Sequence, residues 1–90
     1  MYLHLGADVA IRSKDIIGIF DYKLVDHDSF KEFMEGADWA GNIVEVLESS
    51  AKSVVVTDKK VYLAPVSKAT LVRRCRKNYM PFSILMENEV

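Results

Sequence analysis

The stretch SVVVTDKKVYLA, residues 53–64, determines the centre of the predicted fold. Its two ends, 53–57 and 61–64, are rich in valine, threonine and tyrosine, the residue types that strands favour. The polar segment Asp58-Lys59-Lys60 between them is short enough to predict a hairpin. Pro65 ends the second strand because it has no backbone N–H to donate to the ladder.

Further apolar runs predict strands on the N-terminal side of this hairpin. They cover residues 2–5, 9–11, 16–20 and 43–47. Gly18, inside the third run, either marks a bulge or lets another backbone approach closely. With the hairpin, these runs make six short strands.

Two segments have the apolar spacing of helices. In residues 30–40, four apolar side chains recur at i, i+3, i+4 and i+7: Phe30, Phe33, Met34 and Ala37. Ser29 and Glu32 predict a capping box at the start of this helix. In residues 68–77, after a capping Ser67, three side chains share one side: Leu71, Val72 and Cys75.

The resulting order is strand, strand, strand, helix, strand, strand, strand, helix. It predicts an α+β, strand-dominated domain with about six short antiparallel-type strands, one central helix and one C-terminal helix. At 90 residues the chain has the length of one domain, which we expect to cover 1–77, with 78–90 as a C-terminal extension. A domain this small buries only about 60–65% of its unfolded surface, so self-association would add stability.

Cysteine usage and the absence of targeting patterns indicate a cytoplasmic protein. Cys75 is the one cysteine, which excludes an internal disulfide and favours a reducing compartment. The opening residues lack the basic and apolar regions of a signal peptide. The longest weakly charged run, 78–86, is too short to span a bilayer, so we expect no membrane partner.

Acidic and basic residues are segregated along the chain, although the formal net charge is only −1. Residues 26–48 hold seven acidic residues against Lys31 alone, a balance of −6. Residues 52–77 hold eight basic residues against Asp58 alone, a balance of +7. The two segments can pair between copies of the chain, or the basic one can contact a polyanion. The simpler interpretation is two solvated faces of opposite charge.

Residues suited to catalysis or metal binding are few. His4 and His27 have no cysteine or second histidine at the spacing of a zinc site. Asp26 and Asp28 fall short of the ligand number of a calcium loop and are better explained by the start of a helix. The glycines form no phosphate-binding motif. We therefore expect a protein that is not an enzyme, with no catalytic residue, metal, cofactor or small-molecule substrate.

Two sets of side chains have more than one interpretation. Cys75 is favoured as a packed structural residue, but the flanking Arg74 and Arg76 would favour a reactive thiolate and a redox sensor. A candidate interface, large enough to be core instead, is apolar: Phe30, Phe33, Met34 and Trp39. A domain of short strands has sheet edges to cover, and a ring or dimer covers them.

Several spaced segments resemble the extracellular-matrix-regulator (Rem) family, small bacterial proteins that accompany the control of biofilm-matrix genes. The resemblance rests on residues 2–6 (YLHLG), 15–21 (DIIGIFD) and 53–71, and it covers roughly residues 1–76. The opening string Met-Tyr-x-His-Leu-Gly makes the match nearer to the B-type member than to the A-type DNA-binding member.

This resemblance implies a DNA-associated regulator without enzymatic activity. The A-type member is thought to assemble into rings, and its DNA contacts come from an arginine before the third strand and an arginine pair before the hairpin. Asp15 and Ser49-Ser50 fill those places here, so the A-type contacts do not carry over. Lys14 and Lys52 are the cations beside them.

Two hypotheses follow. The first is a homo-oligomeric regulator of matrix genes that binds duplex DNA through backbone electrostatics. Its candidate contacts form two clusters: Lys14, Lys52, Lys59 and Lys60, then Arg73, Arg74, Arg76 and Lys77. The second hypothesis is a protein-interaction or assembly module without DNA binding, which the loss of the A-type arginines favours.

Overall fold

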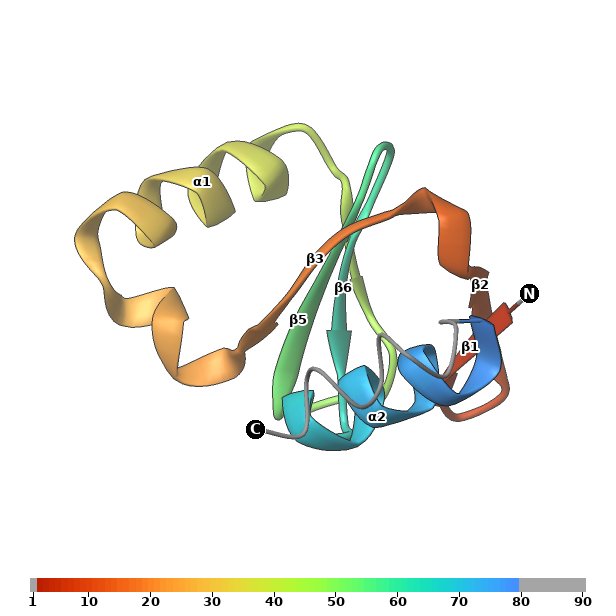
Figure 1. Ribbon diagram of the computed structural model, residues 1–90. Helices are drawn as coiled ribbons and strands as arrows, with labels where there is room; N and C mark the ends of the chain where they lie inside the picture. Colours follow the sequence, from red (N-terminus) through yellow and green to blue (C-terminus); the bar gives the residue numbers. More distant parts are fainter. Residues whose placement is uncertain (1, 80–90) are drawn as a thin grey trace.

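The predicted hairpin lies at the centre of a four-stranded sheet (Figure 1). Its strands are β5 (Ser53–Thr57) and β6 (Val61–Ala64), which pair antiparallel. They are flanked by β3 (Ile16–Asp21) and β4 (Ile43–Glu45), so that the strand order is β3-β5-β6-β4. The computed structural model describes residues 2–79 of the chain.

A second, two-stranded sheet and two α-helices complete the described part of the chain. The small sheet pairs β1 (Tyr2–Gly6) with β2 (Val9–Arg12). The helices are α1 (Asp28–Trp39) and α2 (Lys68–Tyr79), and two short 3₁₀ turns are η1 (Ser13–Asp15) and η2 (Tyr22–Asp26). The predicted α+β class, the six strands and the order of elements are therefore confirmed.

The pairing of β4 differs from the expected antiparallel type. β4 runs parallel to β6, with Ile43 opposite Val61 and Glu45 opposite Leu63. After β4, the chain crosses the end of β6 before it enters β5, and the Lys52 N–H donates to the Ala64 carbonyl at 2.7 Å. β6 thus separates β4 from its neighbour in sequence. The polar segment between β4 and β5 is a crossover, not a hairpin turn.

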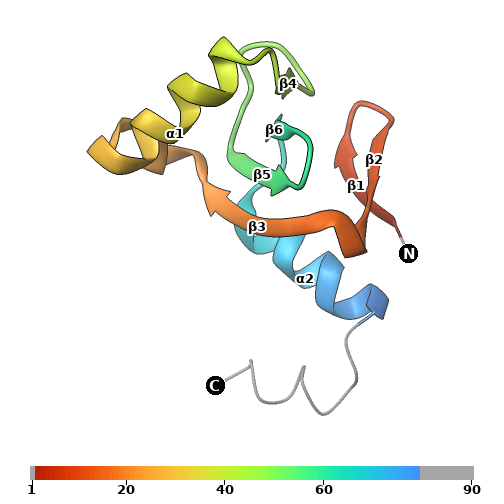
Figure 2. The same cartoon turned by 90° about the horizontal axis from the view of Figure 1, so that it is seen from above.

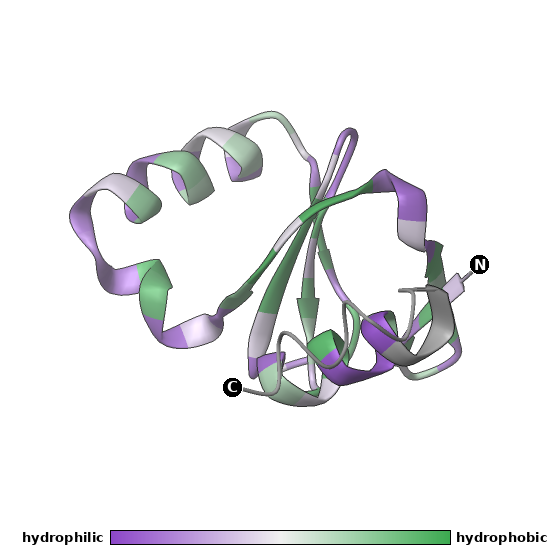
Figure 3. Cartoon of the chain, viewed as in Figure 1, coloured by the Kyte–Doolittle hydropathy of each residue, from purple (hydrophilic) through white to green (hydrophobic). Residues whose placement is uncertain are grey.

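The alternation of β5 side chains divides the core into two layers, one on each face of the sheet. Val55 packs on one side with Leu3, Leu5 and Leu71, from β1 and α2. Val54 and Val56 pack on the other side, against α1. Figure 2 shows the two helices on opposite sides of these strands. Figure 3 shows hydrophobic residues concentrated in the central strands, whereas both helices carry hydrophobic and hydrophilic residues in turn.

Two local expectations are settled by the structure. The capping box is wrong, because α1 begins at Asp28, the Lys31 N–H donates to the His27 carbonyl at 2.7 Å, and no side chain caps the helix. η2 leads straight into His27, so Ser29 already lies inside the helix. Gly18 does mark a bulge, since the register of β3 against β5 shifts between Ile16 and Gly18.

Candidate nucleic-acid interface

The basic side of α2 is produced by the burial of its apolar side. Leu71 is fully buried against β1 and β5, and Cys75 packs on the same cluster. The arginines that lie between these positions must then face outward, and Arg73 and Arg74 are exposed while Arg76 is half-buried. The helix contains no acidic residue. Its outer side is therefore uniformly positive over residues 68–76.

A surface groove beside α2 collects cations from two distant parts of the sequence. It has a volume of about 620 Å³, and we call it the basic groove. Four cations line it: Lys52, Lys68, Arg73 and Arg76. The rest of the lining is Asp21, Ser67, Ala69 and Val72. The structure thus joins one member of the first predicted cluster to two of the second.

Backbone hydrogen bonds hold Lys52 at the edge of this groove. Its N–H donates to the Ala64 carbonyl at 2.7 Å, and its carbonyl accepts from the Tyr22 N–H at 3.1 Å. Across the groove α2 begins at the predicted cap, where the Thr70 N–H donates to Ser67 Oγ at 3.3 Å. The backbone on both sides of the groove is therefore held in place, by main-chain hydrogen bonds at Lys52 and by the Ser67 cap at the start of α2.

The cations of the basic groove have no acidic partner among the described residues. Within residues 2–79 the structure has an ion pair between Arg12 Nε and Asp15 Oδ2, at 3.0 Å, and neither residue lines the groove. Asp21, the one acid of the lining, accepts a hydrogen bond from the Lys23 N–H at 2.9 Å. Four positive charges thus face one solvent-filled depression with little internal compensation.

Arg74 and Lys77 stand apart from the rest of the second cluster. The guanidinium of Arg74 donates to the His4 carbonyl at 3.2 Å, which ties α2 to β1. Arg74 therefore has a place in the fold, outside the lining of the basic groove. The side chain of Lys77 lies outside the part of the chain that is described.

Lys14, Lys59 and Lys60 do not join Lys52, so the structure divides the first predicted cluster. Lys59 and Lys60 follow β5 in the hairpin turn, whereas Lys52 precedes it. Lys14 lies in η1, just before Ile16, which pairs with Thr57 at the turn end of β5. The strand β5 separates these three lysines from the basic groove.

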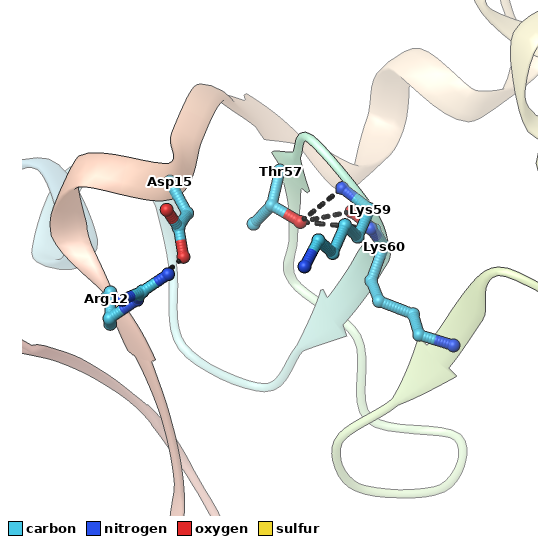
Figure 4. A network of polar contacts seen from close by, with 5 residues as sticks. All are labelled: Arg12, Asp15, Thr57, Lys59 and Lys60. Carbon is cyan, nitrogen blue, oxygen red and sulfur yellow. Dashed lines mark hydrogen bonds and ion pairs between the residues drawn. The ribbon is translucent and has the colours of Figure 1, made fainter.

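The hairpin turn that carries Lys59 and Lys60 is held by one side chain (Figure 4). Thr57 Oγ1 accepts from the backbone N–H groups of Lys59 at 3.3 Å and Lys60 at 3.0 Å. The same hydroxyl donates to the Lys60 carbonyl at 3.0 Å. The backbone of both lysines is therefore ordered although their side chains are exposed.

The positions matching the A-type arginines carry other interactions here. Asp15 is engaged with Arg12, as Figure 4 shows. Ser50 Oγ donates to the Glu48 carbonyl at 3.3 Å, and Ser49 has a positive φ of 59°. These places present a neutralised ion pair and a polar turn, so they offer no cation to a phosphate.

The predicted apolar interface set separates into two pairs. Phe30 and Met34 pack from α1 against the core of the sheet, and the centroid of the Phe30 ring lies 5.3 Å from that of Phe20. Phe33 is 44% exposed and Trp39 is 93% exposed. Sequence reasoning missed Ile17, which is 70% exposed on the edge strand β3. The bulge at the neighbouring Gly18, one of the two alternatives that the sequence left open there, was the signal that could have identified it.

A second groove lies between α1 and the hairpin turn, with a volume of about 460 Å³. We call it the apolar groove because apolar side chains make up six of its thirteen lining residues: Ile17, Phe33, Ala37, Ala40, Val56 and Val61. Lys59, Lys60 and Asp58 border it on the turn, and Glu32 borders it on α1. Exposed apolar side chains of this kind mark sites where another molecule binds.

Side chains that could bind a metal ion do not cluster in the described part of the chain. Over residues 2–79 no three side chains among histidine, cysteine, aspartate and glutamate gather closely enough to hold a metal ion. Cys75 packs against the core beside Leu71, as a structural cysteine would. No helix in this part of the chain is both long and apolar enough to cross a membrane.

Comparison with known proteins agrees with this picture. The family model described as "RemA-like: Extracellular matrix regulatory protein A-like" matches residues 2–75. The chain is also 36% identical, over 76 residues, to the extracellular matrix regulatory protein B of Bacillus subtilis (strain 168). That match covers 84% of this chain and 91% of the relative. The expected resemblance is thereby confirmed, and the chain belongs to the RemA-like family of extracellular matrix regulatory proteins, on its B-type side.

Proposed function

We propose that this chain is a non-enzymatic, homo-oligomeric regulator of extracellular-matrix genes that binds duplex DNA through the basic groove. The name of its Bacillus subtilis relative supports the regulatory role. The observation that carries DNA binding is the convergence of Lys52, Arg73 and Arg76 on one depression without acidic partners.

Phosphate contacts explain how such a groove would hold a duplex. Each lysine or arginine that meets a phosphate releases condensed counterions, so affinity falls as salt rises. The first turn of α2 also opens into the groove, and backbone N–H groups at a helix N-terminus favour anions. No feature of the groove selects particular bases, so it supports binding that is largely independent of sequence.

The test is an anisotropy titration of a labelled random duplex at several salt concentrations. In the full chain, R73E/R76E should lower affinity at least tenfold at low salt. It should also reduce the slope of log K against log salt by about 2, one unit for each lost phosphate contact. The matched control K59E/K60E makes the same charge change at the other end of β5.

Two outcomes would count against binding at the basic groove. Equal losses in both variants would mean that only the overall charge matters. No binding of the unaltered chain at low salt would remove DNA from the proposal.

The second candidate function is an assembly module without a DNA role. The specific observation in its favour is the engagement of Asp15 by Arg12, where the A-type member has an arginine. In that case α1, which carries Asp28, Glu32, Glu35 and Asp38, would meet the basic α2 of a neighbouring copy. Exposed ion pairs contribute only about 0–1 kcal/mol each, so apolar residues would supply most of the interface energy.

Self-association is common to both candidates, and light scattering over a range of protein and salt concentrations tests it. We expect the molar mass to exceed that of one chain at micromolar protein, and to change little with salt if apolar contacts dominate. A monomer under all conditions would eliminate the oligomer from both candidates.

A further inference from the structure

We propose that the apolar groove is the docking site for the C-terminal segment, residues 80–90, of a second copy of this chain. The proposal deepens the self-association proposed above and rests on it. It assigns a role to Ile17, Lys59 and Lys60, which the basic groove leaves unused.

The groove leaves apolar side chains of the domain exposed to water. Ile17 of β3 is 70% exposed, and Phe33 of α1, which lines the same groove, is 44% exposed. β3 is also an edge of the four-stranded sheet, so nothing in the described chain pairs with its outer side. An apolar segment laid into the groove would remove these side chains from water.

The chain beyond α2 has the composition that such a groove would bind. Residues 80–86 are MPFSILM, with apolar side chains at Phe82, Ile84, Leu85 and Met86. Glu87 and Glu89 follow directly. The segment is thus apolar first and acidic last, within eleven residues.

Charge complementarity orients this segment. Lys59 and Lys60 border the groove on the hairpin turn beside Asp58, so this side carries a net charge of +1, and Thr57 holds the backbone of both lysines in place. Glu32 borders the opposite side, on α1. The acidic end of the segment would therefore lie at the turn, with its apolar part across Ile17 and Phe33 and its charges away from Glu32.

The arrangement of the helices favours a segment from another copy. α2 packs on the face of the sheet that carries Val55, together with Leu71. The apolar groove lies on the other face, where Val56 packs towards α1. The point where the segment begins, at the end of α2, therefore belongs to the face opposite the chain's own groove, which favours docking in the groove of a neighbouring copy.

The first experiment measures binding of a labelled synthetic peptide of residues 80–90 by anisotropy. The starting chain is full-length I84D/L85D, because its own altered segment should leave the groove open to the peptide, and the variants below are made in this chain. Binding should be lost in I17K and in F33D, two changes at exposed positions that the fold should tolerate. K59E/K60E should weaken it about tenfold at low salt. K52E/K68E, which makes the same charge change at the basic groove, should leave it unaltered.

A charge swap gives the sharpest result. A peptide carrying E87K and E89K should bind the starting chain weakly and should regain affinity for the K59E/K60E protein. Failure of the swap to restore binding would overturn the assigned orientation, and absence of peptide binding would overturn the site.

The second experiment separates a neighbour's segment from the chain's own. Full-length I84D/L85D should show a lower molar mass than the unaltered chain in light scattering at the same concentration. An unchanged mass in a peptide-binding protein would mean that the segment folds back on its own domain, which overturns the proposal and leaves self-association standing. An unaltered chain that is monomeric at every concentration would instead disprove self-association, even where I84D/L85D binds the peptide.

Discussion

The two faces of the four-stranded sheet are covered to different extents. On the face of α2, Leu3, Leu5 and Leu71 are fully buried and form one cluster with Val55. On the face of α1, the helix contributes no fully buried residue, and Trp39 is 93% exposed. The first face is completed within the chain. The second is completed only in part, which is why the exposed apolar side chains gather there.

The difference has a cause in the composition of the two helices. α2 needs few apolar residues because β1 and β2 close the same layer from the side. The layer of α1 is closed by half-buried side chains, among them Val25 of η2 and Ile43 of β4, and acidic residues flank the apolar stripe of the helix. A thin core layer of this kind is enough for the domain to fold, but it leaves apolar side chains exposed where another molecule can bind.

Truncating one residue on each face gives the largest expected contrast. L71A should lower the free energy of unfolding by about 3 kcal/mol, because it opens a cavity in a fully buried site. M34A, at a half-buried site on α1, should cost about 1 kcal/mol. Urea unfolding followed by circular dichroism, at one protein concentration for both variants, measures the two losses. Equal losses would show that the α1 face is as well packed as the α2 face.

Replacing each of two glycines on the α1 face by alanine should change the free energy of unfolding in opposite directions. In G18A the new Cβ would lie 2.7 Å from Phe20 Cε2, so the Phe20 ring, which packs 5.3 Å from the Phe30 ring, must shift. We expect a loss of about 1–2 kcal/mol from this crowding. G36A meets no atom within 4 Å, and alanine in a helix should add about 0.5–1 kcal/mol. Thermal unfolding of both variants tests the signs, and a loss in G36A would show that the apolar groove is tighter than described.

A smaller effect should come from a hydrogen bond on the α2 face. Ser53 Oγ donates to the Val66 carbonyl at 2.7 Å, just before the cap of α2. S53A leaves that carbonyl without its donor and should cost about 1 kcal/mol. The control is S50A, which removes an exposed hydroxyl bonded to the Glu48 carbonyl and should change stability by less than about 0.5 kcal/mol. Chemical denaturation distinguishes them, and indistinguishable midpoints would contradict a role for Ser53 in anchoring α2.

Local patterns predicted the elements better than their partners. The β-branched runs around Asp58-Lys59-Lys60 and the spacing of Phe30, Phe33 and Met34 depend on neighbours within a few residues. The structure confirms both. The pairing of β4 with β6 and the meeting of Lys52 with Arg73 depend on contacts between segments far apart in the sequence. One sequence has no signal for such contacts, since several strand orders bury the same side chains.

The amino-acid sequence was enough to establish the α+β class, the order of the elements, the family and the separation of acidic and basic charge. These properties depend on residue type and short-range spacing, which are the same for every possible order of the strands. Folding in three dimensions selected which cations share a groove, which of the apolar residues on α1 stay exposed, and that Asp15 is neutralised by Arg12. Those outcomes follow from burial. Leu71 and the valines of β5 occupy the two core layers, and their burial determines which side chains of α1 and α2 face the solvent.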